Sequence, residues 1–101
     1  MSSVKIAKTA DVPDGTAIRA GLAGSDILIC NAGGQFYAIE DVCTHDGGEL
    51  DQGVLDGCEI ECPRHGARFD VRTGAALTLP AVLPVRTYPV RVEGEDIFIE
   101  R

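Results

Sequence analysis

Apolar and polar residues alternate over short stretches of this chain, and Gly, Pro, Asn and Asp separate the stretches. A period of two is typical of strands that bury one face. No stretch of ten or more residues repeats its apolar positions with the period of a helix. We therefore expect an all-β fold. The alternation predicts strands over residues 4–6, 16–20, 26–31, 35–40, 54–55, 58–62, 68–71, 85–92 and 97–99.

The middle of the chain differs from its two ends, because residues 41–57 are rich in Gly and Asp and are typical of loops. We expect one domain over residues 1–101, with residues 1–40 and 80–101 forming an antiparallel β-sandwich base. Residues 41–79 would form a loop-rich subdomain inserted into that base. Pro89 lies inside a predicted strand and has no N–H for a sheet ladder, so we expect an edge strand or a bulge there.

Charge and hydropathy exclude several classes of protein. A formal net charge of −7 disfavours nucleic-acid binding, because the phosphate backbone would repel the chain. No apolar run is long enough to cross a bilayer, and residues 1–5 lack the apolar core of a signal peptide. We expect a cytoplasmic monomer that binds neither nucleic acid nor a membrane. In that compartment the four Cys would stay reduced, which favours metal ligation over disulfides.

Two motifs in the middle segment each pair a thiol with an imidazole, Cys43-Thr44-His45 and Cys62-Pro63-Arg64-His65, and they use both His of the chain. Iron–sulfur clusters are usually held by four thiolates, and two imidazoles on one iron make a cluster easier to reduce. The pairs fit a [2Fe–2S] cluster whose irons take the two Cys and the two His separately. A zinc site is the alternative, and a zinc protein would be colourless.

The sequence also resembles a known family. Residues 43–45 and 62–66 resemble the Rieske [2Fe–2S] signature. Residues 69–74, 79–81 and 88–94 resemble the ferredoxin components of bacterial aromatic-ring-hydroxylating dioxygenases. The resemblance covers nearly the whole chain. Structural zinc sites usually pair Cys with Cys and His with His at short spacing, whereas both pairs here are mixed, which disfavours zinc.

The resemblance implies a function and a ligand set. Cys43 and Cys62 would bind the buried iron of one Rieske-type [2Fe–2S] cluster per chain, and His45 and His65 the outer iron. The protein would be an electron carrier and not an enzyme. It would take electrons from an NAD(P)H-dependent flavin reductase and deliver them singly to a terminal oxygenase.

Departures from related proteins predict a low reduction potential. The Rieske proteins of cytochrome bc complexes carry two further Cys that form a disulfide, and here those positions are Gly48 and Arg64. They also carry a Ser and a Tyr that donate hydrogen bonds to sulfur, and here those positions are Ala67 and Phe69. Donors to sulfur stabilise the reduced cluster, so their absence predicts a midpoint potential toward the negative end of the Rieske range, about −150 mV.

The middle segment is also acidic. Residues 41–70 contain eight Asp and Glu against two Arg, which is six of the seven net negative charges. The acidic residues are Asp41, Asp46, Glu49, Asp51, Asp56, Glu59, Glu61 and Asp70. An acidic surface around the cluster would attract a basic partner, and the rate of electron transfer would then fall with added salt. The same residues would also suit a solvated face with no partner.

Other functions stay open at this point. The catalytic Rieske part of an oxygenase needs a second iron site with two more His, and the chain has none left. Proteins resembling the small subunit of nitrite reductase commonly lack the cluster ligands. A Rieske ferredoxin for iron–sulfur assembly, or for another redox system, fits equally well. Cys30 and Cys58 lie in predicted strands, and we expect buried thiols there and not ligands.

Overall fold

A computed structural model describes residues 3–22, 25–42, 44, 50, 53–63, 66–79 and 83–100 of the chain. These residues form strands and one short 3-10 turn, η1, so the all-β expectation is confirmed. The strands recur near their predicted positions, with small differences at their ends. The elements are β1 (Ser3–Lys8), η1 (Thr9–Asp11), β2 (Ala17–Leu22), β3 (Ser25–Ala32), β4 (Gln35–Glu40), β5 (Val54–Asp56), β6 (Glu59–Glu61), β7 (Arg68–Asp70), β8 (Thr87–Tyr88), β9 (Val90–Glu93) and β10 (Asp96–Glu100).

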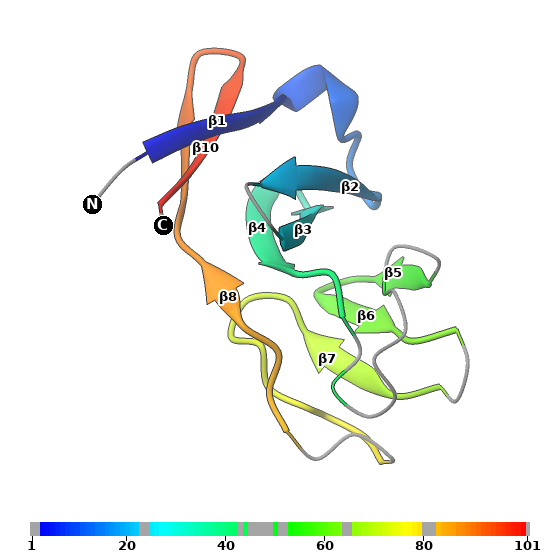
Figure 1. Ribbon diagram of the computed structural model, residues 1–101. Coiled ribbons are helices and arrows are strands. Elements are labelled where there is room, and N and C mark those ends of the chain that lie inside the picture. The colour runs from blue at the N-terminus through cyan, green and yellow to red at the C-terminus, as the bar shows by residue number, and fades with distance from the viewer. Residues whose placement is uncertain are drawn as a thin grey trace.

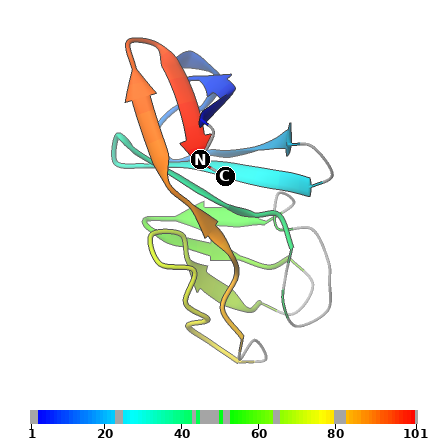
Figure 2. The ribbon, with the colours of Figure 1, turned by 60° about the vertical axis from the view of Figure 1, so that its left-hand side comes forward.

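The strands pair in antiparallel fashion into three sheets, with the strand orders β1–β10–β9, β2–β3–β4–β8 and β5–β6–β7. Figures 1 and 2 show the sheet of β2, β3 and β4 between the other two. The first and last strands pair, with Ser3 opposite Glu100, so both ends of the chain lie on the same sheet. The small β5–β6–β7 sheet forms the opposite end of the molecule (Figure 1).

Strand β3 is buried on both faces, because a hydrophobic core lies on each side of it. Ile27, Leu28, Ile29 and Cys30 are all 0% exposed. Successive side chains of a strand point to opposite faces, so these four residues divide between two cores. The core toward β10 contains Val12, Ile27, Ile29, Ala38, Tyr88, Ile97 and Ile99. The core toward β6 and β7 contains Leu28, Cys30, Ile39, Leu50, Ile60, Cys62, Ala67, Phe69, Val71 and Val85.

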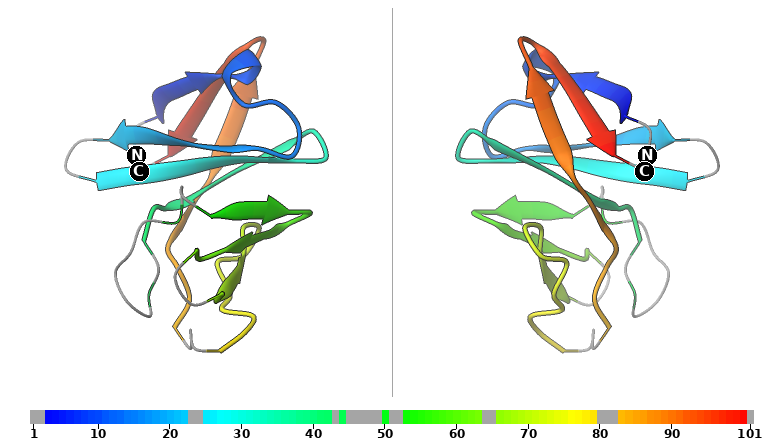
Figure 3. Two further views of the ribbon diagram at one scale, coloured as in Figure 1. Left: turned by 90° about the vertical axis from the view of Figure 1, so that its right-hand side faces the viewer. Right: turned by 90° about the vertical axis from the view of Figure 1, so that its left-hand side faces the viewer.

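Pro89 divides the strand that the alternation predicted over residues 85–92. Tyr88 pairs with Ala38 in the β2–β3–β4–β8 sheet (the central sheet). Val90 instead pairs with Ile99 in the β1–β10–β9 sheet (the terminal sheet). The prediction of one continuous strand is therefore wrong, because Pro has no N–H with which to continue the ladder. The expected edge position is confirmed, since β8 and β9 are both edge strands. Figure 3 shows this segment running along the molecule from the end that holds β7 to the terminal sheet.

In the part of the chain that the structure describes, no helix is long and apolar enough to cross a membrane.

Candidate functional site

The structure describes one of the four predicted cluster ligands. Cys62 directly follows β6, at the end of the molecule formed by the β5–β6–β7 sheet, and it is 1% exposed. Cys43, His45 and His65 lie outside the described residues, as do Gly48 and Arg64. The four-residue ligand set therefore stays a prediction, and the described part of the site consists of Cys62 and the residues that surround it.

Two backbone hydrogen bonds fix the conformation at Cys62. Its N–H donates to the carbonyl oxygen of Ala67 at 2.7 Å, and the N–H of Gly66 donates to its own carbonyl oxygen at 3.0 Å. Gly66 has a φ of +75°, a conformation that residues with a side chain rarely adopt. The chain thus leaves β6 at Cys62 and enters β7 after Ala67, and hydrogen bonds join the two ends of this connection. In sequence, this connection includes the predicted ligand at position 65.

The surroundings of Cys62 are apolar. Its side chain belongs to the same buried cluster as Leu50, Ala67 and Phe69, all of which are 0% exposed. Ala67 and Phe69 have no hydroxyl group, so neither side chain can donate a hydrogen bond to sulfur. Among the described residues, the surroundings of the thiol are therefore apolar. They lack the Ser and Tyr hydroxyl groups that the Rieske proteins of cytochrome bc complexes carry at positions 67 and 69.

Thr44 connects the first predicted ligand segment to a distant part of the chain. Its Oγ1 donates to the carbonyl oxygen of Leu83 at 2.7 Å. In sequence, Thr44 lies between Cys43 and His45. Sequence reasoning did not single it out, because nothing near position 44 shows that its partner is 39 residues away.

The acidic residues of the middle segment do not all lie on the surface. Asp41 and Asp70 are 6% and 9% exposed. Burial of Asp70 is balanced by Arg72, whose backbone N–H and Nε donate to Oδ1 at 2.8 and 3.1 Å and whose Nη2 donates to Oδ2 at 2.9 Å. These bonds lower the pKa of the Asp70 carboxyl. Counting Asp41 and Asp70 as part of an acidic docking surface was wrong, because both are buried inside the fold.

Three other acidic residues surround one guanidinium on the β5–β6–β7 sheet. Arg68 lies 3.4 Å from Asp56, 3.3 Å from Glu59 and 3.1 Å from Glu61. All three carboxylates are at least 40% exposed. This group carries two net negative charges and is the exposed acidic surface among the described residues of the middle segment. Asp46, Glu49 and Asp51 lie outside the described residues.

Cys30 and Cys58 are free thiols of different exposure. Cys30 is 0% exposed, which confirms the expectation of a core thiol. Burial raises the pKa of Cys30 to about 12, with a smaller contribution from the charge of Asp41. The expectation of a buried strand thiol is wrong for Cys58, which is half-buried in the turn before β6 and packs against the core around Ile60.

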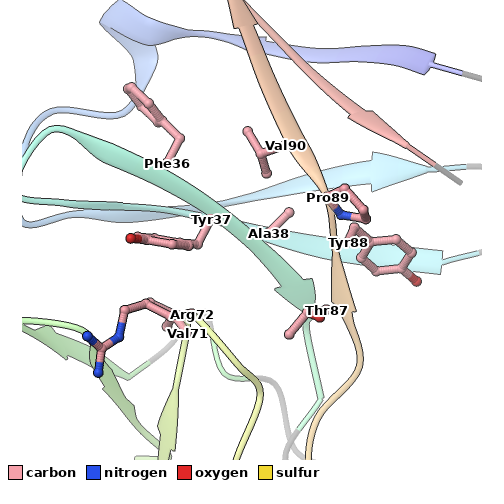
Figure 4. Close-up of a pocket in the computed structure, with 9 residues that line it drawn as sticks. All are labelled: Phe36, Tyr37, Ala38, Val71, Arg72, Thr87, Tyr88, Pro89 and Val90. Atoms are coloured by element: carbon pink, nitrogen blue, oxygen red, sulfur yellow. The ribbon is translucent and has the colours of Figure 1, made fainter.

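A pocket of about 290 Å³ lies between β4, the turn after β7 and the chain around Pro89 (Figure 4). Tyr37 and Arg72 lie on one side of it, and Tyr88 and Pro89 lie on the other. The guanidinium of Arg72 is already bonded to Asp70. An anionic ligand would have to compete with that carboxylate, so we assign no ligand to this pocket.

The comparisons with known proteins identify the family. The family model described as Rieske [2Fe-2S] domain matches residues 2–89. This chain belongs to the Rieske [2Fe–2S] domain family. The Rieske chain is 46% identical over 101 residues to the 3-phenylpropionate/cinnamic acid dioxygenase ferredoxin subunit of Shigella boydii serotype 4 (strain Sb227), covering 99% of this chain and 94% of that protein.

Solved structures resemble this Rieske domain over nearly its whole length. The ferredoxin of carbazole 1,9a-dioxygenase from Nocardioides aromaticivorans IC177 has a TM-score of 0.93 and 40% identity, covering 98% of this chain and 97% of that one. A complex of reduced oxygenase and oxidized ferredoxin in carbazole 1,9a-dioxygenase contains a chain with a TM-score of 0.91 and 36% identity, covering 96% and 91%. The resemblance predicted from the sequence is confirmed.

Membership of the family confirms the expected cofactor, a Rieske-type [2Fe–2S] cluster. The described residues fit that group, because Cys62 offers a soft thiolate ligand in a dry turn next to Ala67 and Phe69. In the described residues, no three His, Cys, Asp or Glu side chains lie together as a metal site would require. That result does not test the predicted ligand set, since three of its four residues lie outside the described residues.

Proposed function

We propose that this Rieske protein is a ferredoxin that carries single electrons to the terminal oxygenase of an aromatic-ring dioxygenase system. The observation that carries the proposal is the 46% identity, over 99% of the chain, to a dioxygenase ferredoxin subunit. A similar ferredoxin has been solved in complex with its oxygenase. The proposed electron donor is a flavin-containing NAD(P)H reductase, which the resemblance implies. The protein itself is a transfer component and not an enzyme.

The proposed ligands are Cys43, His45, Cys62 and His65. When bound, a Rieske [2Fe–2S] cluster accepts and releases one electron at a time. The role of Cys62 is supported by its burial and by the two hydrogen bonds that hold its backbone. The residues around it exclude water from the thiol side. Ala67 and Phe69 supply no hydroxyl donors, which supports a potential near the negative end of the Rieske range, about −150 mV.

The proposed organisation is a single Rieske domain over residues 1–101, with the base and the inserted cluster-binding subdomain expected from the sequence. The position of the β5–β6–β7 sheet at one end supports this division (Figure 1). We also propose that the protein acts in the cytoplasm as a monomer. The free thiols of Cys30 and Cys58 suit a reducing compartment.

The proposed docking surface for the oxygenase includes two exposed leucines, one of which is bonded to the first ligand segment. Leu79 and Leu83 are 77% and 61% exposed, and large apolar side chains this exposed often mark protein interfaces. The carbonyl group of Leu83 is bonded to Thr44, which lies between two proposed ligands in sequence. An oxygenase that covered these leucines would therefore approach the cluster.

A spectroscopic and kinetic experiment tests the proposed function. The purified protein, loaded anaerobically with iron and sulfide, is expected to be red-brown and to give a Rieske electron paramagnetic resonance spectrum when reduced. After reduction it should pass electrons to purified 3-phenylpropionate dioxygenase or carbazole 1,9a-dioxygenase in stopped-flow mixing. A colourless protein, or one that holds only zinc, would end the proposal. His65→Ala should lose or degrade the spectrum, and an unchanged spectrum and midpoint would refute the ligand assignment.

A further inference from the structure

Asp41 lies where the chain leaves the central sheet and enters the first ligand segment. Its backbone N–H donates to the carbonyl oxygen of Asp26 at 3.0 Å, which continues the pairing of β3 with β4. The preceding residue, Glu40, donates its N–H to the carbonyl oxygen of Arg86 at 2.8 Å. The backbone is therefore held on both sides just before the segment that contains Cys43 and His45.

The carboxylate of Asp41 connects the two ends of that segment. Oδ1 accepts a hydrogen bond from the N–H of Leu50 at 2.7 Å, and Asp41 is only 6% exposed. A buried carboxylate is costly unless it is hydrogen-bonded, and a bond to a charged acceptor is stronger than a bond between neutral groups. This bond joins two buried residues nine positions apart, since Leu50 is 0% exposed.

Leu50 in turn connects to β6, the strand that precedes Cys62. The carbonyl oxygen of Leu50 accepts the N–H of Gly53 at 2.9 Å. Gly53 packs so closely on the backbone carbonyl group of Glu61 that an added Cβ would collide with it. Glu61 is the last residue of β6 and precedes Cys62. A short path thus runs from the Asp41 carboxylate through the backbone of Leu50 and Gly53 to the second ligand segment.

We infer that Asp41 is a positioning residue for the cluster. Its carboxylate bonds to the Leu50 N–H, and so ties the backbone on both sides of the proposed ligands Cys43 and His45 to the core that contains Cys62. The inference rests on the proposed ligand set. Asp41 acts through the backbone and is not itself a ligand. Groups that orient ligands in this way control metal affinity and the electronic properties of the site.

Two substitutions separate the hydrogen bond from the charge. Asp41→Ala removes the acceptor, whereas Asp41→Asn keeps an oxygen that can accept from the Leu50 N–H. For holoprotein carrying Asp41→Ala, we expect shifted g values in the reduced spectrum, a changed midpoint potential and loss of the cluster about tenfold faster or more. Asp41→Asn should restore g values and a loss rate close to those of the unsubstituted protein.

Asp14 offers a matched control in the base. Its Oδ1 accepts the N–H of Gly33 at 2.8 Å, so it also closes a stretch of chain through a carboxylate. Asp14→Ala should leave the g values, the midpoint and the rate of cluster loss unchanged. If Asp41→Ala behaved like Asp14→Ala in all three measurements, the inference would be overturned.

Hydrogen exchange on the unsubstituted holoprotein tests the same bond even if Asp41→Ala does not fold. Mass spectrometry resolved to single amides should find the Leu50 N–H strongly protected. Exchange of that amide at the rate of an unstructured peptide would overturn the inference. An unsubstituted protein without a Rieske spectrum would instead contradict the proposed function, so the two failures are distinguishable.

Discussion

At the scale of single residues, the site depends on chemistry that is hidden from solvent. Cys62 is held by two backbone hydrogen bonds in an apolar turn, whereas Cys58 is half-buried in the neighbouring turn. Asp41 and Asp70 are buried carboxylates with hydrogen-bond partners. Residue type alone does not separate a ligand from a plain thiol, or a surface charge from a buried one.

The two cysteines on either side of β6 give a direct comparison. Cys62→Ser is expected to abolish the Rieske spectrum, because a thiolate ligand is lost. Cys58→Ser should keep the cluster at full iron content, since Cys58 is predicted to be a packing thiol. Iron and sulfide analysis with electron paramagnetic resonance measures both. Equal loss of cluster in the two variants would contradict the ligand assignment.

The Asp70–Arg72 pair predicts an acid-dependent stability. Hydrogen bonds from Arg72 lower the pKa of Asp70 in the folded protein below its unfolded value. The stabilisation is therefore present above the unfolded pKa, about 3.9, and is lost as the pH falls through the folded pKa. Asp70→Asn should lower the melting temperature at pH 7 by about 5 °C, and should flatten its decrease in acid.

Circular dichroism melting between pH 7 and pH 2 measures this effect. Asp56→Asn is the control, because Asp56 is paired with Arg68 but its side chain is 74% exposed. An exposed pair of this kind contributes little, so the control should follow the unsubstituted protein. Equal acid dependence for Asp70→Asn and the unsubstituted protein would count against the role of the pair.

At the scale of elements, close backbone approach holds the small sheet against the first ligand segment. Gly53 precedes β5, donates its N–H to Leu50 and packs on the carbonyl group of Glu61 in β6. Position 53 does not accommodate a side chain, because an added Cβ would collide with the backbone of Glu61. The φ of Gly53 is not the reason. Pro89 acts at the same scale, since it ends one ladder and lets the chain join another sheet.

Adding one methyl group at Gly53 should disturb this contact. Gly53→Ala is expected to destabilise the protein by about 2 kcal/mol or more, because backbone has to move to make room. Gly21→Ala in β2 is the control, since a Cβ there meets nothing within 4 Å. Thermal unfolding measures both variants. A Gly53→Ala protein as stable as Gly21→Ala would show that the contact is loose.

At the scale of the whole molecule, charge and exposed apolar surface set how a partner can approach. The net charge is −7, and the described part of the middle segment shows an acidic group around Arg68. Leu79 and Leu83 add exposed apolar surface, and the carbonyl group of Leu83 is bonded to Thr44 in the first ligand segment. A basic partner with an apolar centre would match both features.

The leucines predict a kinetic effect without a redox effect. The double variant Leu79→Ser, Leu83→Ser should lower the second-order rate constant for reduction of the oxygenase about tenfold or more, because apolar contacts at the interface are lost. The midpoint potential should not change. Val92→Ser is the control, since Val92 is 43% exposed on β9 in the terminal sheet. A double variant as fast as Val92→Ser would place docking elsewhere.

Net charge predicts a dependence on ionic strength. Raising salt from about 10 mM to about 500 mM shortens the screening length severalfold, so the rate constant with a basic oxygenase should fall. Because Asp41 and Asp70 are buried, they do not contribute to the acidic surface expected from the sequence. The rate constant should therefore depend on salt less strongly than the count of acidic residues in the middle segment would predict. Stopped-flow mixing at several salt concentrations measures the slope. A rate constant independent of salt would exclude electrostatic steering.

The sequence by itself determined the features that depend on neighbouring residues. Alternation placed the strands, because the side-chain period of a strand is local. The Cys43–His45 and Cys62–His65 pairs indicated the cofactor, because ligand type and spacing are written in the chain, and the family match confirmed that cofactor. Ala67 and Phe69 could also be compared, position by position, with the Ser and Tyr of the Rieske proteins of cytochrome bc complexes.

Only the tertiary structure decided which charges are buried and which segments meet. From the sequence, Asp41 was expected to be a surface charge, but it is buried and accepts a hydrogen bond from the Leu50 N–H. The sequence also does not indicate that Thr44 donates a hydrogen bond to the carbonyl oxygen of Leu83. The strand predicted through Pro89 divides because two different sheets supply its partners. Burial and strand pairing bring together residues that are far apart in the chain. A local sequence pattern therefore does not indicate which distant residue will be the partner.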